Sequence, residues 1–210
     1  MPEELGKIEK PSVQDFSKGR RLFFIPLIYV GKESPIEYLE KYNKYWDQVE
    51  AQVSELELKL GRATRIYHEF VTMSGEEGVK TTKELNEESY RIIRYRAEKG
   101  AQVEATEDGD ILTEFMDWGR CLAIGLQNHK VLAKVYESYQ EAGKKRNEYI
   151  AKHLNETLKE DEIGLLFLGE GHKVKIPPDI QLFYVSPPAL DEIYRWLRDV
   201  ESRPEEKEQK

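Results

Sequence analysis

The chain has 210 residues, of which 39% are hydrophobic and 34% are charged, and its formal net charge at pH 7 is −8. This length and apolar content suit one α/β domain with helical additions. Nucleic-acid affinity depends on a basic surface that neutralises phosphates, so the acidic balance argues against such a partner. The single cysteine, Cys121, excludes an internal disulfide and a cysteine-based metal site. We expect it to be a small buried hydrophobe.

The ends of the sequence are polar and charged. No apolar run approaches the ~20 residues of a membrane helix, and no targeting segment is recognisable near the start. We therefore expect a cytoplasmic protein with no membrane partner. We expect residues 1–20 to form a flexible arm, residues 21–202 a single α/β domain, and residues 203–210 a disordered tail.

The first apolar run covers residues 22–30 and predicts a buried strand. Pro26 lacks the N–H that a central strand needs, so it indicates either an edge strand or a break at that point. A helix follows, with Ser34 as N-cap and Pro35 at the first helical position, and it ends near Gly61.

The second apolar run, residues 65–71, predicts another strand. A second helix, in one or two pieces, then extends to Gly100, and a short third strand covers residues 101–105. From Asp108 to about Leu158 the pattern is helical, with Asp110 as a cap.

A bend at Asn128-His129 divides this long helical region into a pair of helices. Residues 163–168 and 180–185 predict two further strands, and a last amphipathic helix follows Pro187-Pro188. Strands that alternate with helices indicate a parallel sheet covered on both faces. The sequence thus predicts an α/β fold: a three-layer Rossmann-like unit with a mainly parallel sheet and an inserted helical pair.

Two histidines stand where short apolar runs end. His68 and Glu69 lie at the end of the second strand, and Glu170 and His172 follow the strand at 163–168. Because parallel strands end at one edge, where ligands bind in open α/β sheets, these four side chains are the candidate catalytic residues. Histidine with carboxylates can transfer protons or bind a metal. The alternative is that they are solvated loop residues or one structural hydrogen-bonded pair.

Other charged groups give weaker signals. The turn at residues 74–78 could bind an anion through its N–H groups, but its two glutamates oppose phosphate. Glu114 and Asp117 are expected on an exposed helix face, and His153 as a core or boundary side chain. No spacing matches a metal-ligand signature, so no metal is predicted and the cofactor is unknown.

Four aromatic residues follow helical spacing on the first helix: Tyr38, Tyr42, Tyr45 and Trp46. Such a stripe belongs either to the core or to a subunit interface, where aromatic residues are enriched. On the second interpretation we expect a homodimer with two-fold symmetry.

Residues 146–172 contain a helix end, Arg146-Asn147-Glu148-Tyr149-Ile150-Ala151, then a strand and the turn Gly169-Glu170-Gly171-His172. This order resembles the C-terminal part of TraB-type and Tiki-like proteins, in which an Arg-bearing helix precedes a strand that ends in G-x-G-H. The resemblance implies metal-dependent hydrolase activity. That family also places G-x-x-H near its first strand, where this chain has Gly31-Lys32-Glu33-Ser34 without histidine. In composition the chain is also similar to α/β proteins of thermophiles.

Two functions remain open at this point. The first is a hydrolase-like enzyme that acts on an unidentified small molecule through a His/Glu site at the carboxyl ends of the strands. The second is a non-catalytic binding protein or a self-associating interaction protein. The distance between the imidazoles of His68 and His172 distinguishes the two functions, because a joint catalytic role requires the rings to converge.

Overall fold

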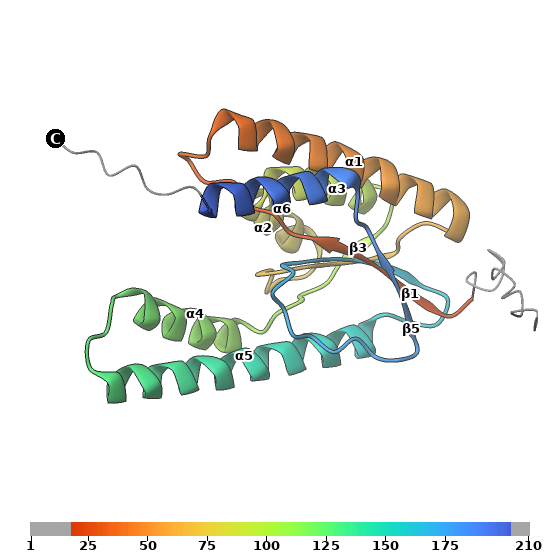
Figure 1. Ribbon diagram of the computed structural model, residues 1–210. Coiled ribbons are helices and arrows are strands. Elements are labelled where there is room, and N and C mark those ends of the chain that lie inside the picture. The colour runs from red at the N-terminus through yellow and green to blue at the C-terminus, as the bar shows by residue number, and fades with distance from the viewer. Residues whose placement is uncertain (1–17, 203–210) are drawn as a thin grey trace, which may run out of the picture.

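The computed structural model describes residues 18–202 (Figure 1). In this part of the chain five strands form one sheet, and six helices are arranged on its two sides. The strands are β1 (Arg20–Pro26), β2 (Arg65–His68), β3 (Gln102–Val103), β4 (Ile163–Leu168) and β5 (Ile180–Tyr184). The helices are α1 (Ile36–Leu60), α2 (Gly75–Leu85), α3 (Glu87–Ala97), α4 (Gly109–Ala123), α5 (His129–Thr157) and α6 (Pro188–Glu201). The arm and tail expected at residues 1–20 and 203–210 lie outside the described residues, apart from residues 18–20.

All five strands are parallel, in the order β3-β2-β4-β1-β5. The predicted parallel sheet and three-layer α/β fold are therefore confirmed. The chain moves outward from β1 to β3, and α4 and α5 then return it to β4, which is inserted between β2 and β1. Every strand ends at the same edge of the sheet, and this edge positions the site described below.

Two hydrophobic layers enclose the sheet. Successive side chains of a strand point to opposite faces, so Phe23 and Ile25 pack on the face covered by α1, α3 and α6. Leu22 and Phe24 pack on the opposite face, against the second half of α5. Figure 1 shows α1, α3 and α6 together on one side of the sheet and α4 and α5 on the other.

The aromatic stripe of α1 belongs to the core. Tyr38, Tyr42, Tyr45 and Trp46 are all buried, and the Trp46 ring stacks on Phe167 of β4 with 6.5 Å between centroids. These side chains are therefore not available to a partner. Any surface for self-association has to lie elsewhere on the molecule.

The first strand and first helix differ in detail from the prediction. β1 lies between β4 and β5, so Pro26 marks the end of a central strand rather than an edge. The N-cap of α1 is Pro35, not Ser34, because the Ser34 hydroxyl instead accepts the N–H of Gly31 at 2.9 Å.

Two other boundaries also shift. β2 ends at His68, earlier than predicted, because Phe70 takes a left-handed conformation with φ 67°. Asp108, rather than Asp110, caps α4, while Asn128 caps α5 at the predicted bend. Within residues 18–202, no helix is long and apolar enough to cross a bilayer.

Close contact between strands requires a glycine at position 164 of β4. A Cβ built there would lie 2.8 Å from Leu22 Cδ1 and 3.1 Å from Tyr67 Cε2. We predict that Gly164→Ala lowers the free energy of unfolding by about 1–3 kcal/mol, because the packed sheet cannot accommodate the methyl group. Urea denaturation measures this. The matched control is Gly109→Ala, whose Cβ meets nothing within 4 Å, and an equal loss in both variants would contradict the prediction.

Candidate functional site

Side chains from four strand ends and from α5 meet at the carboxyl edge of the sheet. We call this set the strand-end site: Tyr29, Glu69, Glu107, Arg146 and His172. Tyr29 follows β1, Glu69 follows β2, Glu107 lies beyond β3 and His172 follows β4, while Arg146 comes from the middle of α5. The parallel topology brings these distant residues together.

A buried ion-pair network forms the centre of the site. Arg146 donates from Nε and Nη2 to the two oxygens of Glu107, each at 2.6 Å, and from Nη2 to Glu69 Oε1 at 2.8 Å. All three residues are at least 92% buried, with exposed fractions of 8%, 2% and 7% respectively for Arg146, Glu107 and Glu69. Burial by itself lowers the pKa of Arg146, but the hydrogen bonds and charges of Glu107 and Glu69 outweigh it and raise the pKa. The guanidinium therefore stays charged.

The position of Glu69 follows from strand geometry. It comes directly after His68 and so points to the opposite face, toward α5. Its second oxygen, Oε2, accepts the N–H of Gly169 at 2.8 Å, and a Cβ on Gly169 would lie only 3.1 Å from that oxygen. Both carboxylate oxygens are thus held, which makes Glu69 a fixed charge rather than a mobile base.

Phe70 holds an unfavourable conformation beside the network. Positive φ is uncommon for a bulky residue and marks positions that surrounding contacts enforce. Its N–H donates to Glu107 Oε1 at 2.8 Å, and its ring lies 5.2 Å from the Arg146 guanidinium carbon. The left-handed turn therefore aims both a backbone donor and an aromatic face at the network.

His68 is enclosed in the core. Its Nδ1 lies 2.6 Å from the carbonyl oxygen of Glu69, and its Nε2 lies 3.0 Å from Ser89 Oγ. A carbonyl only accepts, so Nδ1 carries the proton of the neutral ring. Nε2 contacts the Ser89 hydroxyl, whose single proton is shared with the Asn86 carbonyl at 3.0 Å. Burial lowers the pKa of His68 from 6.5 to about 4, so the ring is neutral and both of its nitrogens are occupied.

His172 is half-buried and has one occupied nitrogen. Its Nδ1 accepts the N–H of Val174 at 3.1 Å, which places the proton of the neutral ring on Nε2. Among the described residues, Nε2 has no hydrogen-bond partner. Burial lowers the pKa of His172, and nearby Arg146 lowers it further, against opposing effects of Glu69 and Glu170. The ring is therefore a neutral donor with a free N–H.

The two histidines lie on opposite faces of the sheet. The His68 ring stacks on Phe167, in the layer under α1, with 5.7 Å between centroids. The His172 ring packs on Phe24, in the layer under α5, at 5.1 Å. The two imidazoles therefore do not converge, which argues against a joint catalytic role for them. Glu69 and His172 lie on the same face, under α5, and His68 is separated from them.

Glu170, the fourth candidate, is exposed in the turn between β4 and His172. Its Oε2 accepts the hydroxyl of Tyr194 from α6, and burial and this carboxylate raise the pKa of Tyr194. Among the described residues, Oε1 has no hydrogen-bond partner. Glu170 therefore has one oxygen available to solvent or a ligand.

Tyr29 completes the site from the β1 side. Burial is the main cause that raises the pKa of its phenol, and the negative charge of Glu69 raises it further. Its side chain is 43% exposed, and its carbonyl accepts the Tyr38 hydroxyl at 2.8 Å. The phenol therefore remains protonated, at the boundary between the network and solvent.

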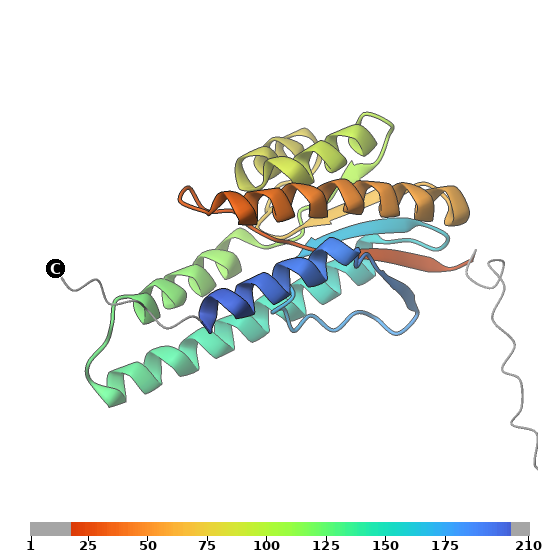
Figure 2. The same cartoon turned by 45° about the horizontal axis from the view of Figure 1, so that its top comes forward.

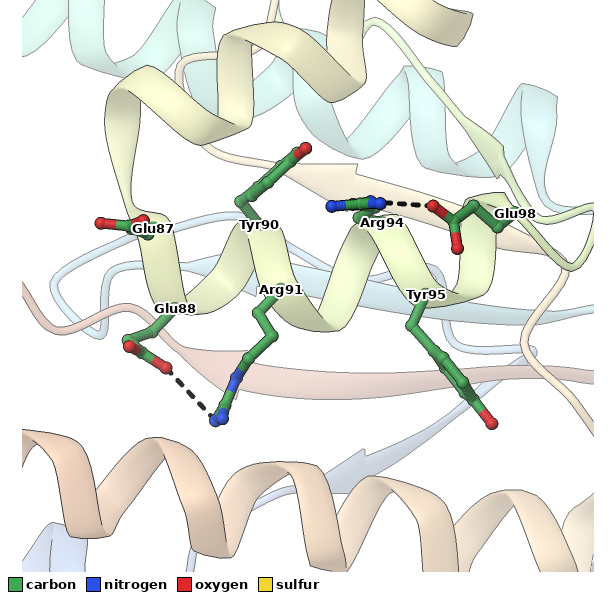
Figure 3. Close-up of a pocket in the computed structure, with 7 residues that line it drawn as sticks. All are labelled: Glu87, Glu88, Tyr90, Arg91, Arg94, Tyr95 and Glu98. Carbon is green, nitrogen blue, oxygen red and sulfur yellow. Dashed lines mark hydrogen bonds and ion pairs between the residues drawn. The ribbon is translucent and has the colours of Figure 1, made fainter.

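Within residues 18–202, no group of three or more His, Cys, Asp or Glu side chains is arranged to hold a metal ion. A separate hollow of about 420 Å³ lies on the outer side of α3 (Figure 3). Six of the seven residues that line it come from this one helix and the seventh, Glu98, is its C-cap. Arg91 and Arg94 are paired with Glu88 and Glu98. The hollow is a solvated helix surface, and none of its lining residues belongs to the strand-end site.

Sequence analysis missed Tyr29, Glu107 and Arg146 as site residues. Glu107 comes soon after the short third strand, so the rule that selected Glu69 also applies to it. Arg146 lies four residues before Ile150, on the apolar stripe of α5, where a charged residue requires a buried partner. Tyr29 lay within the predicted strand, and no signal in the sequence distinguished it.

Comparison with known proteins adds no relative. No family model matches the chain, and neither the curated proteins nor the solved structures contain a significant match.

We predict that Arg146→Leu lowers the free energy of unfolding by about 3–5 kcal/mol, because it leaves two buried carboxylates without a counter-charge. Urea denaturation at neutral pH measures the loss. The matched control is Lys145→Leu, one residue earlier, whose amine is exposed and 3.4 Å from Glu114; it should change stability by less than about 0.5 kcal/mol. A loss below about 1 kcal/mol for Arg146→Leu would contradict the buried network.

The buried ring of His68 makes the stability of the protein depend on pH. Because the pKa of His68 is lower in the folded protein than the ordinary 6.5, the unfolded chain takes up its proton first as pH falls. His68 therefore removes up to about 3 kcal/mol of stability between pH 6.5 and 4. Urea denaturation of the wild type and of His68→Gln should show a smaller pH dependence in the variant. An equal change of the unfolding free energy with pH in the wild type and the variant would contradict this prediction. The control is His129→Gln, at an exposed position.

Proposed function

We propose that the protein is a hydrolase-like enzyme whose active site is the strand-end site together with Glu170. The observation that carries the proposal is the free Nε2–H of His172, held beside a buried ion-pair network at the carboxyl edge of a parallel sheet. In this proposal His172 binds the substrate oxygen and Glu170 activates water.

The role of His172 follows from its tautomer. Because Nδ1 accepts from the backbone, the neutral ring donates from Nε2 and is not available there as a base. A fixed donor stabilises the negative charge that develops on a carbonyl oxygen when water adds to it, and one such donor contributes about 100–1,000-fold in rate. The lowered pKa of His172 keeps this donor neutral at physiological pH.

Glu170 is the proposed general base: it takes a proton from the attacking water and returns it to the alcohol or amine that leaves when the ester or amide bond breaks. Its Oε1 is available, whereas Tyr194 fixes Oε2 and so orients the carboxylate. Glu69 is unsuited to this role because Arg146 and the Gly169 N–H hold both of its oxygens. We assign Glu69, Glu107 and Arg146 the task of positioning the loop after β4, and His68 a structural task in the core.

Charge indicates the substrate class. Three carboxylates and one guanidinium give this region a formal charge of −2, which disfavours phosphates and other anions. A neutral carboxylic ester or amide fits better. The resemblance of residues 146–172 to TraB-type and Tiki-like proteins supports the proposal to the extent that Arg146 and His172 both belong to the site.

The second candidate is a binding protein that uses the same site without turnover. It is favoured by the fact that every oxygen of Glu69 and Glu107 is already paired, as in a structural network. On this interpretation a bound ligand shifts the ring resonances of His172 in NMR spectra while no product forms.

Hydrolysis of a panel of neutral p-nitrophenyl esters and anilides tests the enzyme. We predict that His172→Ala lowers kcat about 100-fold or more, because the donor to the developing oxyanion is lost. His172→Gln should retain part of the activity, since its amide can donate from a similar position. Glu170→Gln should also lower kcat, because an amide cannot take a proton from water.

The control is Lys173→Ala, next to His172 in the same exposed turn, which should leave kcat unchanged. If the wild type hydrolyses nothing in the panel, or if His172→Ala keeps full activity, the assignment of His172 as donor is wrong. Ligand-induced shifts of His172 without turnover would establish the binding protein instead.

A further inference from the structure

A two-helix arm projects beyond the carboxyl edge of the sheet. It consists of α4 and the first half of α5, residues 109–145, which lie side by side and extend further than α1 or α6 in both views (Figures 1 and 2). The Phe115 and Tyr139 rings stack between the two helices at 4.8 Å. No layer of the sheet lies against the outer part of this arm.

The arm exposes an unusual amount of apolar surface. Five of its large hydrophobic side chains are 36–73% exposed: Met116, Ile124, Val131, Leu132 and Tyr136. Four of them lie in residues 118–136 and the fifth, Met116, lies just before, so they reach about two helical turns back from the tip on each helix. Large exposed apolar side chains gathered on one projecting element are a feature of interaction sites.

The arm also carries opposite charges at its two ends. At its base, residues 108–117 of the α4 side and 137–145 of α5 together carry six acids and two lysines, a formal charge of −4; one of these lysines, Lys145, lies 3.4 Å from Glu114. Residues 118–136, which include the tip, have three bases and no acid: Arg120, Lys130 and Lys134. The first turn of α5 contains no acidic residue, although the helix dipole favours acids there. Two of the three bases form exposed ion pairs within the arm, Arg120 with Asp117 and Lys134 with Glu137. Such exposed pairs contribute little stability, so they can be exchanged for pairs with another chain.

We propose that the arm is a homodimer interface, in which it packs antiparallel against the same arm of a second copy of this chain. The antiparallel arrangement places each basic tip against the acidic base of the partner arm, so the charges are complementary at both ends. It also buries the apolar surface between them, and a two-fold axis relates the two copies.

A second copy fits the arm better than a lipid surface does. The exposed apolar residues are not limited to the last turn of the arm, because they reach back to Met116 on α4 and to Tyr136 on α5. A membrane surface also lacks neighbouring acidic and basic regions that would match both the basic tip and the acidic base of the arm. The inference rests on the arm alone and is independent of the proposed activity.

Sedimentation velocity of the full chain at micromolar concentrations tests the dimer. We expect a mass twice the 24.6 kDa of one chain. Val131→Asp and Tyr136→Asp should each weaken dimerisation at least about tenfold, because they place a charge in the apolar interface. Leu58→Asp, at an 88% exposed position on α1, is the matched control and should remain dimeric. Circular dichroism shows that each variant is folded.

A charge exchange tests the antiparallel direction. The tip variant Lys130→Glu/Lys134→Glu and the base variant Glu114→Lys/Asp117→Lys should each dimerise more weakly than the wild type, because like charges then face each other. Mixed together, the two variants should form a heterodimer, in which both ends are complementary again.

Three outcomes would overturn the proposal. The first is a wild type that is monomeric throughout the concentration range, and the second is a dimer that none of the arm variants weakens. The third is a monomer that co-sediments through its arm with phosphatidylserine-containing vesicles, which would make a lipid surface the occupant.

Discussion

The buried guanidinium of Arg146 is the constraint on which the functional end of this molecule depends. A charge removed from water is tolerated only with close, well-oriented counter-charges, and here these come from the loops after β2 and β3. The β4 loop joins the network through the Gly169 N–H. One side chain thereby fixes α5 against three strand ends, and the conformation of Phe70 follows from the same contacts.

The two edges of the sheet use arginine differently. At the amino edge, Arg20 binds Asp179 and the terminal carbonyls of α5, and Arg21 binds the Leu60 carbonyl that ends α1. These contacts satisfy helix ends that otherwise lack partners. At the carboxyl edge the network is equally complete, but it leaves the His172 Nε2–H and one oxygen of Glu170 unoccupied at its border. The proposed chemistry is therefore assigned to the carboxyl edge.

Hydrophobic periodicity predicted the order of elements and the parallel sheet, because fully buried strands such as residues 163–168 are apolar throughout. It could not predict that β4 lies between β2 and β1, since strand order depends on how helices cross the sheet. The opposite directions of His68 and Glu69 were available from strand alternation alone. The pairing of Arg146 with Glu69 and Glu107 could not be predicted from the sequence, because the three residues lie 38–77 positions apart and meet only in the folded chain.

α5 connects the proposed interface with the proposed active site. The helix is continuous over 29 residues, and Val131 and Arg146 are about 22 Å apart along its axis. Its second half packs in the core through Ile150 and Leu154, and its first half belongs to the projecting arm. The Phe115 ring of α4 lies 5.0 Å from the Arg146 guanidinium carbon, which gives the arm a second contact with the network. In the proposed dimer, the partner arm would therefore contact the same helix that carries Arg146.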